Sequence, residues 1–337
     1  MRFVPSRGRR LLVAAVAATL ALSACSTTGA EDGSAAPAGS AAAGGDQFPV
    51  TVTTAFGDIT IPKQPTRVVT LGWSDAEVAL ALGVQPVGDA NWMAFEGDGQ
   101  GVWNQGRYTT PPAKVGTLEL DMEKIAALKP DLILDTRSSG EKARYDQISA
   151  LGVPVVDIPA GGAAYKTTWE QQLDLIGKAL GKSAEAAKLK TDLEAQFAAV
   201  VAANPSFKDK TVSAGVKTSE GWGAYVSGDG RVDFLQKLGL EDAPAIEALK
   251  KETFFIELSQ EQVNLLDADL TTIFMIGVPV AEVKGDKLLQ AVPSVKAGHV
   301  VYLDDPAISA AFSSNSVLGL KYALEKVPPL LATALAG

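Results

Sequence analysis

Residues 118–132 read LELDMEKIAALKPDL, and residues 256–270 read IELSQEQVNLLDADL. The two stretches align without a gap at an offset of 138 residues. Two copies this far apart predict two similar lobes, because a solenoid needs at least three short repeats. Two lobes imply a cleft between them, and small ligands commonly bind in such clefts. The identical pairs are Glu119 and Glu257, Leu120 and Leu258, Glu123 and Glu261, Leu128 and Leu266, Asp131 and Asp269, and Leu132 and Leu270.

Short apolar segments alternate with amphipathic ones along the chain. This alternation predicts an α/β fold with mostly parallel sheets covered by helices. Near the N-terminus, residues 48–62 alternate apolar and polar side chains around a Gly57-Asp58 turn, which predicts a hairpin. The other expected strands are 67–71, 84–88, 132–134, 153–157, 211–216, 270–276 and 300–303, and the expected helices include 74–82, 142–151, 169–180, 183–203 and 316–331. The expected helix caps are Ser74 or Asp75, Asp121, Ser183 and Ser259.

The first 24 residues have the layout of a secretory signal. Basic residues precede an apolar run, Leu11–Leu22, that is too short for a lasting transmembrane helix. The sequence Leu22-Ser-Ala-Cys25 resembles the lipobox of bacterial lipoproteins, which implies cleavage before Cys25 and lipidation of that cysteine. A plain secretory signal with an incidental cysteine, or a twin-arginine signal at Arg9-Arg10, are the alternatives. Residues 25–47 contain too few apolar side chains to offset their ordering entropy, so we expect a flexible tether.

The composition argues against several classes of function. The net charge is −9, and the signal contains four of the basic residues and no acid, so an acidic body that does not bind nucleic acid is expected. Zinc or manganese sites need several imidazoles with carboxylates, whereas the chain has one histidine, His299, in a strand-like context. Gly72-Trp-Ser-Asp-Ala76 approaches the nucleophile-elbow pattern but lacks its last glycine. A P-loop is absent too, so neither a hydrolase nor an ATPase is expected.

Four separated segments resemble, in the same order, the substrate-binding proteins of ABC importers for iron-siderophores and cobalamin, the class III periplasmic binding proteins. These segments are 65–71, 77–88, 122–134 and 294–303, although Arg or Lys commonly stands in the family where this chain has His299. The likeness extends over roughly residues 49–331 and implies two Rossmann-like α/β lobes with a ligand cleft, joined by a single long rigid helix. The implied parts are an N-terminal lobe at 48–168, connecting helices at 169–204 that include the inter-lobe helix 183–203, and a C-terminal lobe at 205–337.

The resemblance also gives the repeated glutamates a meaning. In the family, one surface glutamate per lobe pairs with arginines of the membrane permease. Carried over to this chain, that role falls to Glu123 and Glu261, with Glu119 and Glu257 as neighbours. Each of the two glutamates also stands two residues after an expected helix cap, where the helix dipole alone stabilises a carboxylate. From the residues themselves, both interpretations remain open.

Candidate ligand-binding residues follow from the expected sheet edges. Ligands of open α/β sheets bind beyond the carboxyl ends of the strands. Four of the five tryptophans fall in loops expected there, including the stretch 221–225, and their rings suit a bulky, partly apolar ligand. Arginines in the cleft would supply planar donors for the oxygens around ferric iron. The candidates are Trp73, Trp92, Trp103, Tyr108, Arg137, Trp222, Tyr225, Arg231 and Phe312.

Together, the residues and the resemblance predict a lipid-anchored, extracytoplasmic binding protein that captures a ferric-siderophore and delivers it to an ABC permease and its ATPase subunit. Iron would arrive already chelated, so no cofactor and no metal site of the protein's own are expected, and the chain is expected to be a monomer. Binding of cobalamin or haem, and a sensing or adhesion role without transport, are the alternatives. The sequence does not separate hydroxamate, catecholate and citrate ligands.

Overall fold

Residues 45–337 are described by the computed structural model, so the expected signal, Cys25 and most of the expected tether lie outside the described residues. The first sheet follows the hairpin and is entirely parallel, in the order β5-β4-β3-β6-β7. All its strands except the edge strand β5 are buried, because helices lie against both faces. Their bounds are β3 Val68–Thr70, β4 Gly88–Asp89, β5 Ala113–Lys114, β6 Leu132–Asp135 and β7 Val155–Asp157.

The predicted hairpin is present as β1 (Val50–Thr54) and β2 (Gly57–Ile61), which pair antiparallel. Its turn was predicted two residues too late, since Gly57 already belongs to β2. The reason lies in Thr54, whose hydroxyl donates to the Gly57 carbonyl and accepts from the Phe56 amide. This side chain fixes the turn at Ala55 and Phe56.

Three helices complete the first lobe, α1 Asp75–Ala81, α2 Met122–Ala127 and α3 Lys142–Ser149, and the connecting helix α4 Trp169–Ala179 follows. Asp121 caps α2 as predicted, by accepting from the Lys124 amide. The predicted cap at Ser74 is wrong as a side-chain contact, because Ser74 adopts a left-handed conformation and its hydroxyl instead donates to the Ser314 carbonyl. The expected strand 84–88 shrinks to β4, since Pro86 has no amide to donate to a neighbouring strand.

The second lobe contains a six-stranded mixed sheet in the order β11-β9-β8-β12-β13, with β10 pairing to β8 beside this path. Strands β8, β10, β12 and β13 are mutually parallel, whereas β9 and β11 are antiparallel to their neighbours. The bounds are β8 Thr211–Thr218, β9 Trp222–Tyr225, β10 Glu241–Asp242, β11 Phe255–Leu258, β12 Leu270–Ile276 and β13 Val300–Tyr302.

The stretch 221–225 was predicted as a loop and is wrong in that respect, because Trp222–Tyr225 forms strand β9. Thr218 and Gly221 exchange backbone hydrogen bonds in both directions, which closes a tight hairpin between β8 and β9. Side chains in a strand alternate between the two faces, so Trp222 and Tyr225 enter two different hydrophobic cores.

The remaining helices surround the second sheet or connect the lobes. They are α5 Ser183–Ala203, η1 Pro205–Phe207, α6 Gly230–Lys237, α7 Pro244–Glu247, η2 Gln260–Leu266, α8 Val280–Gly285, α9 Lys287–Ala291, α10 Pro293–Ala297, α11 Pro306–Ser314 and α12 Val317–Ala336. Within residues 45–337, none of the helices has the length and apolar character needed to cross a membrane.

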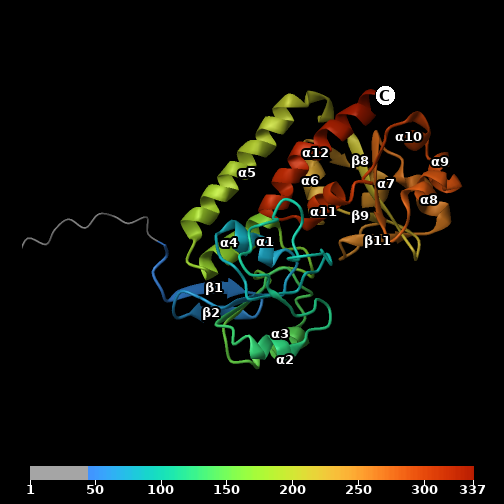
Figure 1. The fold of residues 1–337 in the computed structure, drawn as a ribbon. Coiled ribbons are helices and arrows are strands. Elements are labelled where there is room, and N and C mark those ends of the chain that lie inside the picture. The colour runs from blue at the N-terminus through green and yellow to red at the C-terminus, as the bar shows by residue number, and fades with distance from the viewer. Residues whose placement is uncertain (1–44) are drawn as a thin grey trace, which may run out of the picture. The chain divides into compact units, whose positions relative to one another are not determined.

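One hydrophobic core is shared by both lobes. It contains buried residues of β1, β3 and β6 in the first lobe, of α4 and α5, and of β8, β12 and α12 in the second. Figure 1 shows α5 running from the neighbourhood of β1 and α4 toward that of α12, and α5 contacts both α4 and α12. Two smaller cores cover the opposite face of each sheet. The fold therefore confirms the predicted two α/β lobes joined by a long helix.

The long helix has the predicted bounds, but Ser183 does not cap it. Lys182 occupies the cap position, and the Ser183 hydroxyl donates to the Asp46 carboxylate at 2.5 Å. The same carboxylate accepts from the Ser183 backbone amide. Asp46 therefore supplies, from far away in the sequence, the acceptor that Ser183 was expected to provide.

The sequence repeat has a structural cause. Strands β6 and β12 follow the two copies and lie parallel to the first strand of their respective sheets, β3 and β8. Just before β6, Asp131 accepts hydrogen bonds from the Thr66 and Arg67 amides. Just before β12, Asp269 accepts from the Thr211 amide and hydroxyl. The two identical aspartates thus bind two neighbouring strands together at equivalent places.

Candidate functional site

Three aromatic rings stand side by side beyond the carboxyl ends of the first sheet. The Trp73 ring lies between those of Trp92 and Tyr165, with centroid distances of 4.5 and 4.3 Å and interplanar angles of 8° and 29°. Trp73 follows β3, Trp92 follows β4 and Tyr165 follows β7, and all three side chains are partly exposed. Both faces of the Trp73 ring are covered by its neighbours, so this apolar platform offers a ligand the ring edges and the outer faces of the two flanking rings.

The platform continues into the second lobe. Phe254, which directly precedes β11, meets Tyr165 edge-to-face at a centroid distance of 6.2 Å and is also partly exposed. We call Trp92, Trp73, Tyr165 and Phe254 the aromatic wall. Because its members come from both lobes, this wall spans their junction.

A hydrogen-bond network holds Trp73 in place. The Trp73 amide donates to the Arg137 carbonyl, and Gln172 Nε2 donates to the Trp73 carbonyl at 2.8 Å. Asp75 accepts from the Gly72 and Thr136 amides and from Gln172. Burial raises the pKa of Asp75 to about 7, against these hydrogen bonds.

Gly72 is required where the loops after β3 and β6 touch. A side chain at this position would begin 2.5 Å from the Asp75 carboxylate and 2.8 Å from the Arg137 amide. The small residue therefore allows the close approach that sets the position of Trp73.

Arg137 lies behind the wall, with its guanidinium carbon 6.0 Å from the centroid of the Trp73 ring. Its Nη1 donates to the Ser314 carbonyl at 2.9 Å, and its Nε donates to the Tyr165 carbonyl. Burial lowers the pKa of Arg137 to about 10, so the group stays protonated at neutral pH. Within residues 45–337 no carboxylate forms an ion pair with it.

Arg231 lies on the other side of the same segment, but its charge is already matched. Its Nη1 pairs with Asp229 at 3.0 Å, its Nε donates to the Ser313 hydroxyl, and it stacks over Tyr225 at 4.0 Å. Burial alone would lower the pKa of Arg231, but the Asp229 charge outweighs it and raises the pKa. Of the two predicted arginines, Arg137 is the one that retains an unmatched charge.

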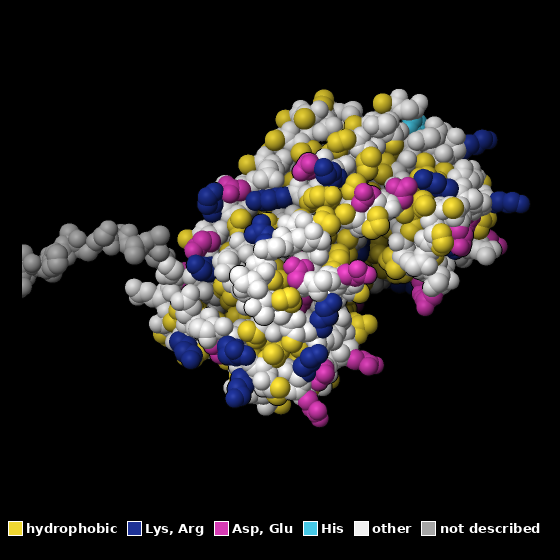
Figure 2. All heavy atoms as spheres, viewed as in Figure 1, with side chains coloured by type: hydrophobic (Ala, Val, Ile, Leu, Met, Phe, Trp, Pro, Cys, Tyr) yellow, Lys and Arg dark blue, Asp and Glu magenta, His cyan; other side chains and the backbone are white. Residues whose placement is uncertain are grey.

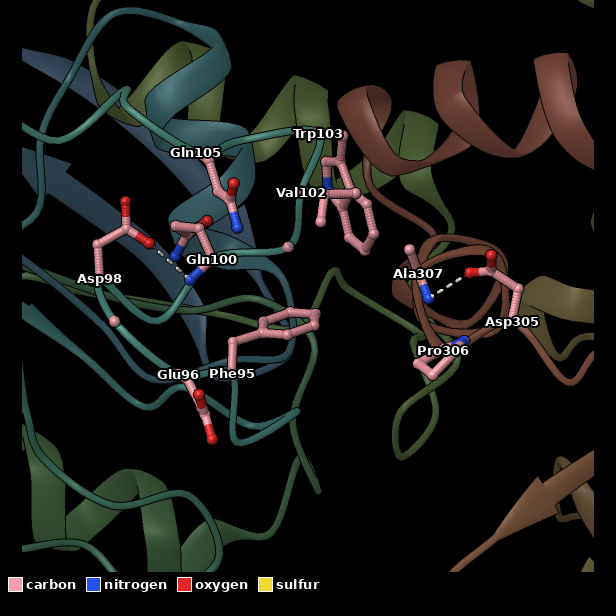
Figure 3. Close-up of a pocket in the computed structure, with 12 residues that line it drawn as sticks. Phe95, Glu96, Asp98, Gln100, Val102, Trp103, Gln105, Asp305, Pro306 and Ala307 are labelled. Carbon is pink, nitrogen blue, oxygen red and sulfur yellow. Dashed lines mark hydrogen bonds between the residues drawn. The ribbon is translucent and has the colours of Figure 1, made fainter. Parts of the chain in front are cut away.

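A pocket of about 810 Å³ opens between the first-lobe loop 95–105 and the start of α11. In Figure 3 the rings of Phe95 and Trp103 point from this loop toward Pro306 and Ala307. Trp103 Nε1 donates to Glu77 at 2.7 Å, and the ring meets Phe95 edge-to-face at 5.7 Å. Phe95 and Trp92 also line one smaller hollow, so the pocket adjoins the aromatic wall.

Glu77 connects this loop to the second lobe. One carboxylate oxygen, Oε2, accepts both from Trp103 Nε1 and from the Ser316 hydroxyl, at the start of α12. Burial raises the pKa of Glu77 to about 7, although these two hydrogen bonds oppose that rise. The carboxyl group is therefore a buried acid that titrates near neutral pH.

The structure brings Trp73, Trp92 and Arg137 together and places Trp103 at the adjoining pocket. Arg231 lies against the same segment as Arg137, whereas the remaining four candidates do not join this group. Trp222 lies in the second-lobe core and donates to Asp286, while Phe312 is fully buried against Phe274. Tyr225 lies under Arg231, and Tyr108 is buried with a hydroxyl that has no partner within the described residues.

Sequence reasoning missed Tyr165 and Phe254. Tyr165 follows β7, so the rule that found Trp73 and Trp92 would have found it if applied to the fourth strand. Phe254 gave no such signal, because it precedes an antiparallel edge strand rather than following a parallel one.

The four repeated glutamates are exposed. Glu123 lies in the first turn of α2 and Glu261 in the first turn of η2. Glu119 and Glu257 are exposed beside them. The single histidine is held internally, with Nδ1 of His299 2.7 Å from the Ala334 carbonyl, as expected for a structural residue.

Residues 68–307 match the sequence profile described as Periplasmic binding protein. The chain is 27% identical over 273 residues to the probable siderophore-binding lipoprotein YfiY of Bacillus subtilis, covering 73% of this chain and 77% of that one. It is 28% identical to the Fe(3+)-citrate-binding protein YfmC of the same organism, covering 74% and 76%. The structure of Streptococcus pneumoniae PiaA in complex with ferrichrome superposes with a TM-score of 0.72 at 27% identity, covering 85% and 99%.

The two-lobed fold, the aromatic wall at the lobe junction and these comparisons all indicate the same class of protein. The chain belongs to the periplasmic binding protein family, whose members are the substrate-binding proteins of ABC importers. It is a binding protein rather than an enzyme.

Proposed function

We propose that this protein captures a ferric-siderophore complex at the aromatic wall and delivers it to an ABC permease. The observation that supports this proposal most strongly is the stack of Trp92, Trp73 and Tyr165, which Phe254 extends across the lobe junction. A partly apolar chelator would lie against the ring edges and the outer faces of the flanking rings. Arg137 adds one unmatched positive charge near the wall.

The relatives support the same class of ligand. YfiY is named for siderophore binding, YfmC for ferric citrate, and PiaA was solved with ferrichrome. Vitamin B12-binding proteins of Salmonella match over only 28% of this chain. Iron in a chelate needs no protein ligands, and within residues 45–337 no group of three or more potential metal-binding side chains is found together.

Two further parts of the proposal concern docking to the permease and attachment to the membrane. Glu123 and Glu261 would dock the two lobes onto the permease, since both are exposed and separately placed, one in each lobe. Lipidation of Cys25 would hold the protein at the outer face of the cell membrane, with residues 25–47 as the tether.

The test is a fluorescence titration of the purified protein, because Trp73 and Trp92 lie in the proposed contact surface. The panel contains ferric hydroxamate, catecholate and citrate complexes, the iron-free chelators, cobalamin and haemin. We expect saturable quenching at micromolar concentrations or below by one ferric class, with a weak response to its iron-free form. Saturation by cobalamin or haemin alone would replace the siderophore proposal, and no saturation at all would favour a role outside transport.

A further inference from the structure

We infer that Glu77 is a positioning residue that holds Trp103 and its loop against the second lobe while the Glu77 carboxyl group is protonated, and that ionisation of this group lets the loop open. The inference adds a dependence on pH to the ligand site. It rests on the proposed function only in taking the pocket beside Trp103 as part of that site. It follows from the geometry of one buried turn at the lobe junction.

This turn, residues 313–316, joins α11 to α12, and all four of its residues are buried. The second lobe holds the turn closely. Arg231 Nε donates to the Ser313 hydroxyl at 3.2 Å. A side chain in place of Gly230 would begin 2.5 Å from the Asn315 side chain, so α6 lies directly against the turn. The turn is therefore a fixed part of the second lobe.

Three side chains of the first lobe reach the same turn. Two of them, Ser74 Oγ and Arg137 Nη1, donate to one of its carbonyls at 2.6 and 2.9 Å. The third is Glu77, whose Oε2 accepts both from the Ser316 hydroxyl and from Trp103 Nε1. Glu77 is thus the side chain that binds the turn and the loop carrying Trp103 to each other.

The Glu77 carboxyl group has no matching charge. It is 4% exposed, and within residues 45–337 no lysine or arginine forms an ion pair with it. A buried, unpaired carboxylate is costly in free energy. The group can avoid this cost either by binding a proton or by moving into contact with water. Contact with water requires the loop to open, because the two donors that enclose the group lie on this loop and at the start of α12.

The groups that face Glu77 leave the balance on the side of the proton. Burial raises the pKa of Glu77 to about 7, against the two hydrogen bonds. The charge of Asp89 in β4 raises this pKa further, and that of Arg137 lowers it. Tyr108, in the segment after the loop, adds no charge because burial raises the pKa of its hydroxyl.

The helices packed against α1 do not reverse this balance. Helix α4 presents the uncharged side chain of Gln172, which donates to Asp75 on α1 itself. Helix α12 presents the Ser316 hydroxyl. Lys321 and Tyr322 of α12 line a separate groove beside the Trp103 ring.

Acid therefore favours the closed loop. In the closed form the pKa of Glu77 is raised from 4.5 to about 7, whereas a carboxyl group in contact with water keeps its ordinary pKa. The advantage of the closed form is complete below pH 4.5 and is lost as pH rises through about 7. A ligand held between loop 95–105 and α11 would consequently bind more tightly at pH 6 than at pH 8.

The test is hydrogen exchange of the full chain without ligand, measured by mass spectrometry and corrected for the intrinsic effect of pH on exchange. Protection of amides in loop 95–105 and at the start of α12 should fall by about fivefold or more between pH 5.5 and pH 8. Amides of β8 report global unfolding and serve as the internal reference. Glu77→Gln should abolish the fall, because its amide oxygen still accepts from both donors but carries no charge.

Two further variants make the result specific. Trp103→Phe removes a hydrogen bond that lowers the pKa of Glu77, so the fall in protection should move to higher pH. Asp157→Asn is the matched control and should keep the fall, because burial raises the pKa of Asp157 to about 7 as well, but this residue bonds to the Ile158 amide at the end of β7.

Three results would overturn the inference: equal protection of the loop at pH 5.5 and pH 8 in the wild type, a fall that persists in Glu77→Gln, or a fall at unchanged pH in Trp103→Phe. Each would leave the proposed function standing, since no ligand is present. Failure of every ferric complex in the fluorescence titration would instead overturn the proposed function, without affecting the exchange result.

Discussion

At the scale of single residues, the buried carboxyl group of Glu77 links loop 95–105 to the second lobe. Glu77 receives the Trp103 indole and the Ser316 hydroxyl on one oxygen, and burial raises its pKa to about 7. Asp75, beside Trp73, has its pKa raised by burial to a similar value. The groups that fix two tryptophans of the site are therefore acids whose pKa values lie near neutral pH.

These acids give the protein an unusual dependence of stability on pH. The folded-state pKa of Glu77 lies above its ordinary value of 4.5, so its contribution is complete below that value and is lost as pH rises through about 7. We expect the free energy of unfolding to fall between pH 5 and pH 8, by on the order of a few kcal/mol, in urea titrations.

The variant Glu77→Gln tests how much of this fall in the free energy of unfolding comes from Glu77. Glutamine presents one oxygen that can accept from both Trp103 and Ser316, so the hydrogen bonds persist without the charge. Its unfolding free energy should vary less between pH 5 and pH 8 than that of the wild type. An identical slope in the two proteins would show that Glu77 does not contribute.

At the scale of elements, the aspartates of the sequence repeat join neighbouring strands. Asp131 and Asp269 each accept backbone amides at the start of the neighbouring strand. Partial burial alone would raise the pKa of Asp131, but its hydrogen bonds outweigh burial and lower it. The pKa of Asp269 is lowered chiefly by the Thr211 amide.

Replacement of either aspartate tests whether it holds the two strands together. Asp131→Asn and Asp269→Asn should each reduce the free energy of unfolding by about 1 to 3 kcal/mol, because a charged acceptor of backbone amides is lost. The effects should add in the double variant, since the two sites lie in different lobes. Asp146→Asn, which removes an exposed i,i+4 ion pair, is the control and should cost less than about 0.5 kcal/mol.

Local patterns predicted most elements, and contacts between distant segments explain what they missed. The Asp121 cap and the bounds of α5 depend on nearby residues and were predicted. The Ser74 hydroxyl bonds to Ser314, and Ser183 bonds to Asp46, so neither partner could be found from spacing. Trp222 was misplaced because a Gly-rich stretch was interpreted as a loop, although Thr218 and Gly221 close a hairpin there.

The candidate site likewise contains residues that local sequence patterns located and one that depends on contacts between distant segments. Trp73, Trp92 and Arg137 follow parallel strands, so the strand-end rule located them. Phe254 reaches the wall only because the second lobe is placed against the first, which depends on tertiary packing.

At the scale of the whole described body, one core passes through both lobes and both connecting helices. Such packing favours small changes in the cleft over a wide hinge motion. A permease would then recognise the protein through its fixed outer surface as much as through closure. On the face shown in Figure 2, acidic and basic side chains are interspersed rather than gathered into one charged patch, so recognition through a few placed residues is expected.

Charge reversal tests that form of docking. The double variant Glu123→Lys, Glu261→Lys should abolish ligand uptake by cells, because two pairings with the permease become repulsive. Its affinity for the ligand should equal that of the wild type, since both side chains are exposed and neither belongs to the wall. Glu194→Lys with Glu282→Lys is the matched control, and normal uptake by the first variant would contradict the docking proposal.

The measurement that tests the central claim most directly is calorimetric binding of the ferric complex by the wild type and by Trp73→Ala. The account predicts micromolar or tighter binding by the wild type, weak binding of the iron-free chelator, and a loss of about tenfold or more in Trp73→Ala. Trp169→Phe is the control, because Trp169 is buried in the core and its indole nitrogen has no partner within residues 45–337. Unchanged affinity in Trp73→Ala, or equal affinity for the ferric and iron-free forms, would contradict the account.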